Sequence, residues 1–156
     1  MNGVATILQQ FDSAWSGEAW HGPALQELLN GVTAAAASAR PIPQAHTIWE
    51  LVLHIRAWEV AVRRRLGGED VELDGEEDFP IAGAGDSAWQ QALAALASGH
   101  QQLRGVIASL SETSLDAIVP GKTHSVSFML HGVIQHNLYH AGQIALLKKA
   151  LGSVTS

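Results

Sequence analysis

The sequence contains no cysteine. This absence excludes thiolate metal sites, a cysteine nucleophile and disulfides, and it leaves imidazole and carboxylate as the available metal ligands. A chain of 156 residues can bury a core without disulfides, and we expect one domain covering residues 1–156. The lack of cysteine agrees with a cytoplasmic protein. The N-terminal segment has no basic run followed by an apolar core, so no secretory signal is expected.

Basic residues are also few. Nine Lys and Arg against fifteen Asp and Glu give a formal net charge of −6, so the overall attraction that drives binding to phosphate backbones is missing. The one basic run, Arg63–Arg65, closes a predicted helix, where positive charge is favourable. No apolar run reaches the roughly 18 residues of a membrane span. We therefore expect neither nucleic acid nor a membrane as a partner.

Apolar residues recur at helical spacing and nowhere alternate over the length of a strand, which predicts an all-α protein. The principal helices are expected at about Val4–Trp15 with a resumption at Pro23–Leu29, then at Thr47–Leu66, at Ala88–Leu110 and from Ser125 or Ser127 to Gly152. Thr47 and Glu50 have the spacing of a capping box, and Asp86 or Ser87 can cap the third principal helix. Four principal helices favour a four-helix bundle.

Residues 67–85 form a long, acidic and glycine-containing link between the second and third principal helices. A link of this length allows two neighbouring helices to run parallel. In a compact domain such a segment is more often a crossover or a wall of a site than a random insertion.

Eight histidines are present, and two of them, His136 and His140, stand four residues apart. At about 100° and 1.5 Å per residue, they differ by about 40° in direction and about 6 Å in height, so both rings can point at one ion. Apolar neighbours such as Val133 and Ile144 indicate that this side of the helix faces inward. His131 lies about 180° from His140 and should face away.

His54 lies in the middle of the second principal helix, on a stripe that otherwise consists of core residues. A neutral imidazole bound to a cation satisfies its ring nitrogen without leaving a bare buried charge, so His54, His136 and His140 form a candidate three-nitrogen metal site. Three protein ligands leave coordination positions open, as in sites that hold water or substrate. The alternative is a set of buried histidines that only donate hydrogen bonds to neighbouring groups.

Four more residues are candidate neighbours of this site. Glu50 precedes the second-helix histidine by one turn and Gln143 follows the histidine pair by three residues, so either can hydrogen-bond a ligand or a bound water. For Glu50, capping is the favoured role. Trp58 can wall a pocket, although inward aromatics are more often core residues, and His21 is a remoter substrate or metal neighbour. The sequence offers no independent general base and no H-E-x-x-H or P-loop motif, so no catalytic residue is assigned.

The segments HTIWELVLHIRAWE, which contains His54, and HGVIQHNLYHAGQI, which contains His136 and His140, resemble the DinB/YfiT-like family of metal-binding four-helix proteins. WHGPALQELLNGV and PIPQAHTIWELVLHI are similar to the YfiT-like branch as well, so the likeness spans most of the chain. The resemblance implies an up-down-down-up four-helix bundle, the three histidines as ligands for one divalent transition metal, usually zinc or nickel, and a homodimer.

Members of this family include thiol-dependent transferases and an isomerase that use low-molecular-weight thiols, together with proteins described only as metal-dependent hydrolases. We therefore expect a metal-dependent enzyme in which the ion lowers the pKa of water or of a thiol and which acts on a small-molecule substrate. Whether the chain is catalytic stays open. One alternative is a non-catalytic metal-binding stress or sensor protein, and another is a metal-free helical protein.

Overall fold

Helices carry the regular structure of residues 3–154, the part of the chain that the computed structural model describes, and no strand occurs within that range. The elements are α1 (Gly3–Trp15), α2 (Leu25–Leu29), α3 (Ala34–Ser38), α4 (Ile48–Leu66), α5 (Gly75–Asp78), α6 (Gly85–Ala108), the 3₁₀ helix η1 (Glu112–Asp116) and α7 (Val126–Val154). The all-α prediction is confirmed.

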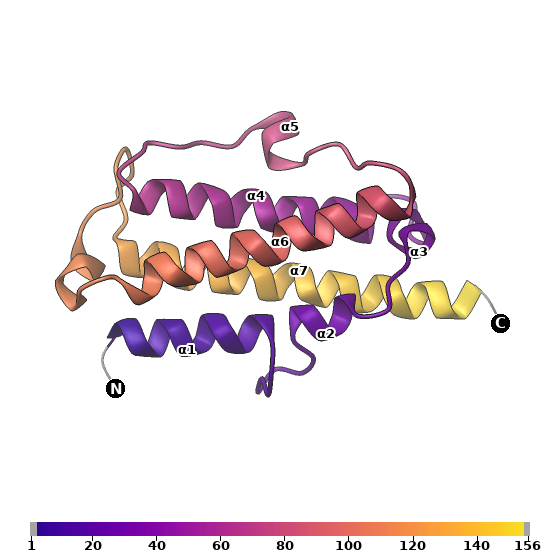
Figure 1. Ribbon diagram of the computed structural model, residues 1–156, viewed down its shortest axis with the longest axis horizontal. Coiled ribbons are helices and arrows are strands. Elements are labelled where there is room, and N and C mark those ends of the chain that lie inside the picture. The colour runs from indigo at the N-terminus through magenta and orange to yellow at the C-terminus, as the bar shows by residue number, and fades with distance from the viewer. Residues whose placement is uncertain (1–2, 155–156) are drawn as a thin grey trace.

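The long helices α1, α4, α6 and α7 lie side by side (Figure 1). Each of α1 and α4 contacts both α6 and α7. In Figure 1, α4 and α6 run from right to left, whereas α1 and α7 run from left to right. The link that contains α5 passes over α4 and returns the chain to the right-hand end, so α4 and α6 can run in the same direction.

The predicted start of α4 is confirmed in detail. The Thr47 hydroxyl accepts a hydrogen bond from the Glu50 backbone N–H at 3.2 Å, and the Glu50 carboxylate accepts one from the Thr47 N–H at 2.9 Å. This reciprocal capping box satisfies backbone donors that the first turn of a helix leaves free. At the start of α7, the Ser125 hydroxyl accepts from the Phe128 N–H at 3.2 Å, as a capping side chain does.

Two predicted helix starts are wrong. The helix α6 begins at Gly85, and its cap position, Ala84, provides no side-chain hydrogen bond, so Asp86 and Ser87 are not caps. Gly85 has a φ of +82°, a conformation that glycine adopts without strain, and the chain enters the helix there. Likewise α2 begins at Leu25 rather than Pro23, after Gly22 turns the backbone at a φ of +126°.

The buried apolar residues form two clusters at opposite ends of the long helices. On α4 the first cluster ends at Ile55 and the second begins at Val62, whereas on α7 the second ends at Ile134 and the first resumes at Ala141. Between them lies a set of buried or half-buried polar side chains that we call the polar layer. Its members are His54, Glu59, His100, His136, Asn137 and His140.

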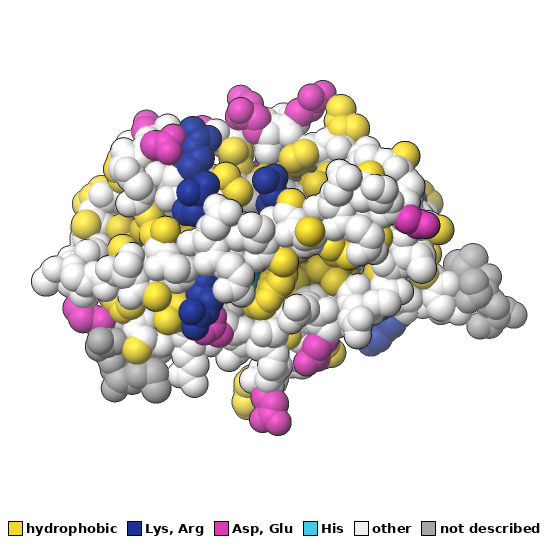
Figure 2. Space-filling model, in the orientation of Figure 1, with side chains coloured by type: hydrophobic (Ala, Val, Ile, Leu, Met, Phe, Trp, Pro, Cys, Tyr) yellow, Lys and Arg dark blue, Asp and Glu magenta, His cyan; other side chains and the backbone are white. Residues whose placement is uncertain are grey.

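On the face shown in Figure 2, acidic side chains gather over α5, and hydrophobic side chains are visible in the furrow between α6 and α2. None of the described helices combines the length and the apolar character needed to cross a membrane.

Candidate metal centre

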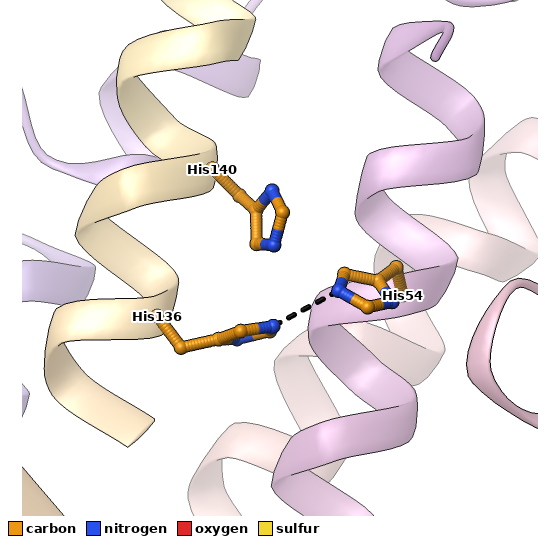
Figure 3. Close-up of side chains that lie close together, drawn as sticks. All are labelled: His54, His136 and His140. Carbon is orange, nitrogen blue, oxygen red and sulfur yellow. Dashed lines mark hydrogen bonds between the residues drawn. The ribbon is translucent and has the colours of Figure 1, made fainter. Parts of the chain in front are cut away.

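The polar layer brings three histidines from two helices to one point. His54 projects from α4, and His136 and His140 project toward it from α7 (Figure 3). One ring nitrogen from each residue lies within 4.8 Å of the other two, and the Nε2 atoms of His54 and His136 are 2.9 Å apart. The spacing argument therefore predicts the cluster correctly, and the geometry is that of a group that can hold a metal ion.

The outer nitrogens of two of these rings have hydrogen-bond acceptors. The Nδ1 of His54 lies 2.8 Å from the backbone oxygen of Asp78, and the Nδ1 of His140 lies 2.7 Å from the side-chain oxygen of Gln143. Because amide oxygens only accept, both Nδ1 atoms carry the proton, and each Nε2 presents its lone pair. Such outer contacts fix the ring orientation of histidine ligands in metal sites.

His136 differs from the other two. Its Nδ1 is buried and has no hydrogen-bond partner among the described residues, so its Nε2–H can donate to the bare Nε2 of His54 in the absence of an ion. A cation facing both Nε2 atoms would move the proton of His136 to Nδ1. The adjacent Asn137 Oδ1 is a buried acceptor that also lacks a partner. The three imidazole ligands, together with the buried atoms that lack hydrogen-bond partners, therefore fit a divalent ion that accepts imidazole ligands.

Burial favours the neutral form of two of these rings. Burial and, to a smaller extent, the charges of His140 and His54 lower the pKa of His136 to about 4, whereas Asn137 acts in the opposite direction. Burial also lowers the pKa of His140, which the hydrogen bond to Gln143 partly offsets. Since only neutral imidazole binds a metal, protons compete weakly with an ion at these positions near pH 7.

The acidic link supplies one wall of the cluster. The Phe79 ring stacks on the ring of His54 at a centroid distance of 4.0 Å, and the ring of His46 stacks on Phe79 at the same distance. The Asp78 carboxylate accepts a hydrogen bond from the Trp58 indole N–H at 2.7 Å and lies 3.1 Å from the Nδ1 of His54. The sequence indicates a wall in this link, but it contains no periodicity that selects Asp78 or Phe79.

The four candidate neighbours have different locations. Gln143 contacts His140, and the Trp58 ring lies 5.8 Å from that of His136, so both border the cluster. The Glu50 carboxylate instead accepts a hydrogen bond from the Arg40 guanidinium at 2.7 Å. It also contacts the Nδ1 of His46 and takes part in the capping box. Burial raises the pKa of Glu50, but these hydrogen bonds outweigh it and leave the pKa lowered. Glu50 thus serves the start of the helix.

His21 lies apart from the cluster. It is exposed and borders a surface depression between α1 and α7. His131 lines the same depression, which agrees with the prediction that it faces away from His140.

A second group of polar side chains lies deeper in the polar layer. The Oε1 of Glu59 accepts hydrogen bonds from Asn137 at 2.7 Å and from the Nδ1 of His100 at 3.0 Å. His100 is stacked against Phe11 and Trp15 at centroid distances of 4.2 and 4.4 Å. Glu59 and His100 are 0% and 1% exposed, so His100 is a buried structural residue.

Fold and site together define an all-α protein with a three-histidine cluster that can hold a metal ion. A sequence model of the DinB superfamily matches residues 19–144, and the chain belongs to that superfamily. The matched range contains α4, α6 and the three histidines. No curated protein and no solved structure matches the chain. The family resemblance predicted from the histidine segments is thereby confirmed.

Proposed function

We propose that the chain binds one divalent transition metal, zinc or nickel, through His54, His136 and His140, and that it is a metal-dependent enzyme for a small-molecule substrate. The observation that carries the proposal is the convergence of three imidazole rings, two of which have their Nδ1 atoms bound to acceptors. The opposite directions of α1 and α7 relative to α4 and α6 support an up-down-down-up four-helix order for the scaffold.

A divalent ion at such a site lowers the pKa of water or of a thiol into the neutral range. The residues around the site perform the rest. Gln143 and the Asp78 carbonyl orient two rings, while Phe79 and Trp58 cover the cluster with aromatic surface. Within the described residues, Asp78 is the carboxylate nearest to the cluster, and Trp58 already occupies one of its oxygens. Because the Trp58 hydrogen bond holds this carboxylate in place, we assign no separate general base among the described residues, which favours a nucleophile activated by the ion itself.

Thiol transfer and hydrolysis are the two reactions that suit this arrangement. Thiol transfer needs a low-molecular-weight thiol as cosubstrate, whereas hydrolysis does not. The test is a turnover assay on metal-reconstituted protein with and without added thiols, with His54→Ala as the control. We expect thiol-dependent turnover that disappears in His54→Ala. Turnover that survives this substitution would contradict the proposal.

The competing proposal is a non-catalytic metal-binding stress or sensor protein. It is favoured by the position of the cluster between two apolar cores, where an ion would tie α4 to α7. In that case His140→Ala should weaken metal binding and lower thermal stability, and no substrate class should show metal-dependent turnover.

We also propose a homodimer in the cytoplasm. The exposed residues Phe128, Tyr139 and Leu146 lie within about 20° of one another around α7, and an exposed apolar stripe of this kind supports association with a second copy. The absence of cysteine agrees with a cytoplasmic location. Light scattering of the metal-loaded protein tests the dimer.

A further inference from the structure

An apolar cavity of about 230 Å³ lies between α4 and α7 and borders the three-histidine cluster. His136 belongs both to the cluster and to the cavity wall. The apolar side chains that line the cavity are Trp58, Val62, Phe128, Met129 and Val133. Because the cavity and the cluster share a side chain, a molecule that reaches the cluster can place part of itself in the cavity.

Two features shape this cavity. Trp58 is fixed by its hydrogen bond to Asp78, so the indole is held as a wall. Gly132 lines the cavity from α7, and a Cβ placed on Gly132 would meet no other atom within 4 Å. Glycine inside a helix is less stable than alanine, and the missing side chain at this position leaves the cavity open.

The charged side chain that lines the cavity is Arg65. It is buried, donates two hydrogen bonds to the Val71 carbonyl and lies 5.5 Å from the centre of the Trp58 ring. Its ion-pair partner Glu72, at 3.7 Å, is exposed and does not line the cavity. His124 is at the wall as well, and no Asp or Glu is among the described lining residues. A cationic ligand would therefore meet Arg65 without a compensating carboxylate in the cavity.

We propose that this cavity receives the apolar end, an aryl or short branched alkyl group, of a small uncharged or anionic ligand whose polar end reaches the three-histidine cluster. The volume is below the roughly 300–1,000 Å³ of a pocket for a whole drug-sized ligand, which fits one ring rather than an entire substrate. The inference rests on the proposed function, because it names the substrate class of the same site.

Benzyl alcohol is a suitable probe because it contains the ring without a thiol or a charge. We expect it to shift the NMR signals of the Gly132 amide and of the Trp58 indole N–H in zinc-loaded protein. Gly132→Leu should weaken binding at least about tenfold by filling the cavity. Gly142→Leu is the matched control, since Gly142 is also on α7, has open space around an added Cβ and lies outside the cavity.

The charge preference has its own measurement. Benzylammonium should bind at least about tenfold more weakly than benzyl alcohol, and Arg65→Met should reduce that difference. The cavity proposal is overturned if the two signals do not move with benzyl alcohol, if Gly132→Leu binds as well as Gly142→Leu, or if benzylammonium binds as tightly as benzyl alcohol.

Cobalt-loaded protein separates this inference from the proposed function. Because the chain has no cysteine, a sulfur-to-cobalt absorption band can arise only from an added thiol. We expect a band with both 2-mercaptoethanol and phenylmethanethiol, at lower concentrations of the latter, and no such preference in Gly132→Leu. A band without preference overturns the cavity and leaves thiol activation intact. Shifts with benzyl alcohol but no band with either thiol would overturn thiol activation and leave the cavity proposal intact.

Discussion

The two groups of polar side chains in the polar layer both contain buried histidine, but only the deeper group pairs its histidine with a carboxylate of its own. In the deeper group, the Glu59 carboxylate accepts hydrogen bonds from His100 and Asn137, and Phe11 and Trp15 cover the His100 ring. This group contains its own negative charge and its own donors, while the Glu59 Oε2, the His100 Nε2 and the Asn137 Oδ1 are buried without a hydrogen-bond partner among the described residues. The Nδ1 of its histidine is bound to a carboxylate within the group.

The three-histidine cluster has no such internal partner. Its ring nitrogens face one another, the outer nitrogens of His54 and His140 are bound, and an apolar cavity adjoins it. A metal is favoured at the cluster because ring nitrogens of three histidines converge on one point, whereas His100 is a single histidine bound to a carboxylate. The following predictions test that difference.

The largest effect is expected for Glu59→Ala. Removing the carboxylate leaves His100 and Asn137 buried without their acceptor, and breaking a buried polar group in this way costs about 3–5 kcal/mol of unfolding free energy. Urea denaturation of the metal-free protein measures it. Metal affinity should stay within about threefold of wild type, since Glu59 is not a ligand. If Glu59→Ala lost metal binding but kept its stability, the structural role assigned to the deeper group would be wrong.

His140→Ala is expected to have the opposite signature. Loss of one of three ligands should lower metal affinity by more than about a hundredfold, which is beyond the effect of an outer residue. The metal-free protein should lose little stability, because the substitution also removes a buried polar ring. Isothermal titration with zinc and urea denaturation of the metal-free variant provide the two values. Unchanged zinc affinity would remove His140 from the site.

Gln143→Ala should lower zinc affinity by about 10- to 100-fold, because the Nδ1–H of His140 loses its acceptor and the ring is no longer oriented. Glu50→Gln is the matched control. The Glu50 carboxylate accepts hydrogen bonds from the Thr47 N–H and the Arg40 guanidinium. Because glutamine can keep the capping hydrogen bond, this substitution should cost less than about 1 kcal/mol of stability and leave zinc affinity unchanged. Equal effects of the two substitutions on zinc binding would contradict the assignment of Glu50 to capping.

A further prediction concerns the pH dependence of the metal-free protein. The pKa of His136 is lowered from 6.5 to about 4, so the unfolded chain takes up its proton first as the pH falls. Stability is therefore full above pH 6.5, declines between about 6.5 and 4, and levels off below that. Urea midpoints from pH 7 to 3.5, compared with those of His136→Ala, provide the test. An identical slope for both proteins would contradict a neutral, buried His136.

Much of the site follows from local sequence rules. Helical angles place His136 and His140 on one face and His131 on another, and the apolar stripe of α4 turns His54 inward. The Thr47–Glu50 capping box depends only on neighbouring residues, and the structure has it as predicted. These features can be predicted because helix geometry alone determines them.

The remainder depends on contacts between distant segments. Asp78 and Phe79 come from a link without periodicity and meet His54 across 24 and 25 positions, while Glu59 and His100 pair across 41 positions. The start of α6 depends on the positive φ of Gly85, which a helical pattern does not reveal. The cavity arises from a glycine whose missing side chain is significant only once α4 is packed against α7.

Metal content is the most direct test of the account. Protein purified without a metal-affinity tag, reconstituted with zinc and freed of excess, should contain one equivalent per chain by elemental analysis, and His54→Ala should contain less than about a tenth of that. A wild-type protein without stoichiometric metal, or a His54→Ala protein that retains it, would contradict a metal site at His54, His136 and His140.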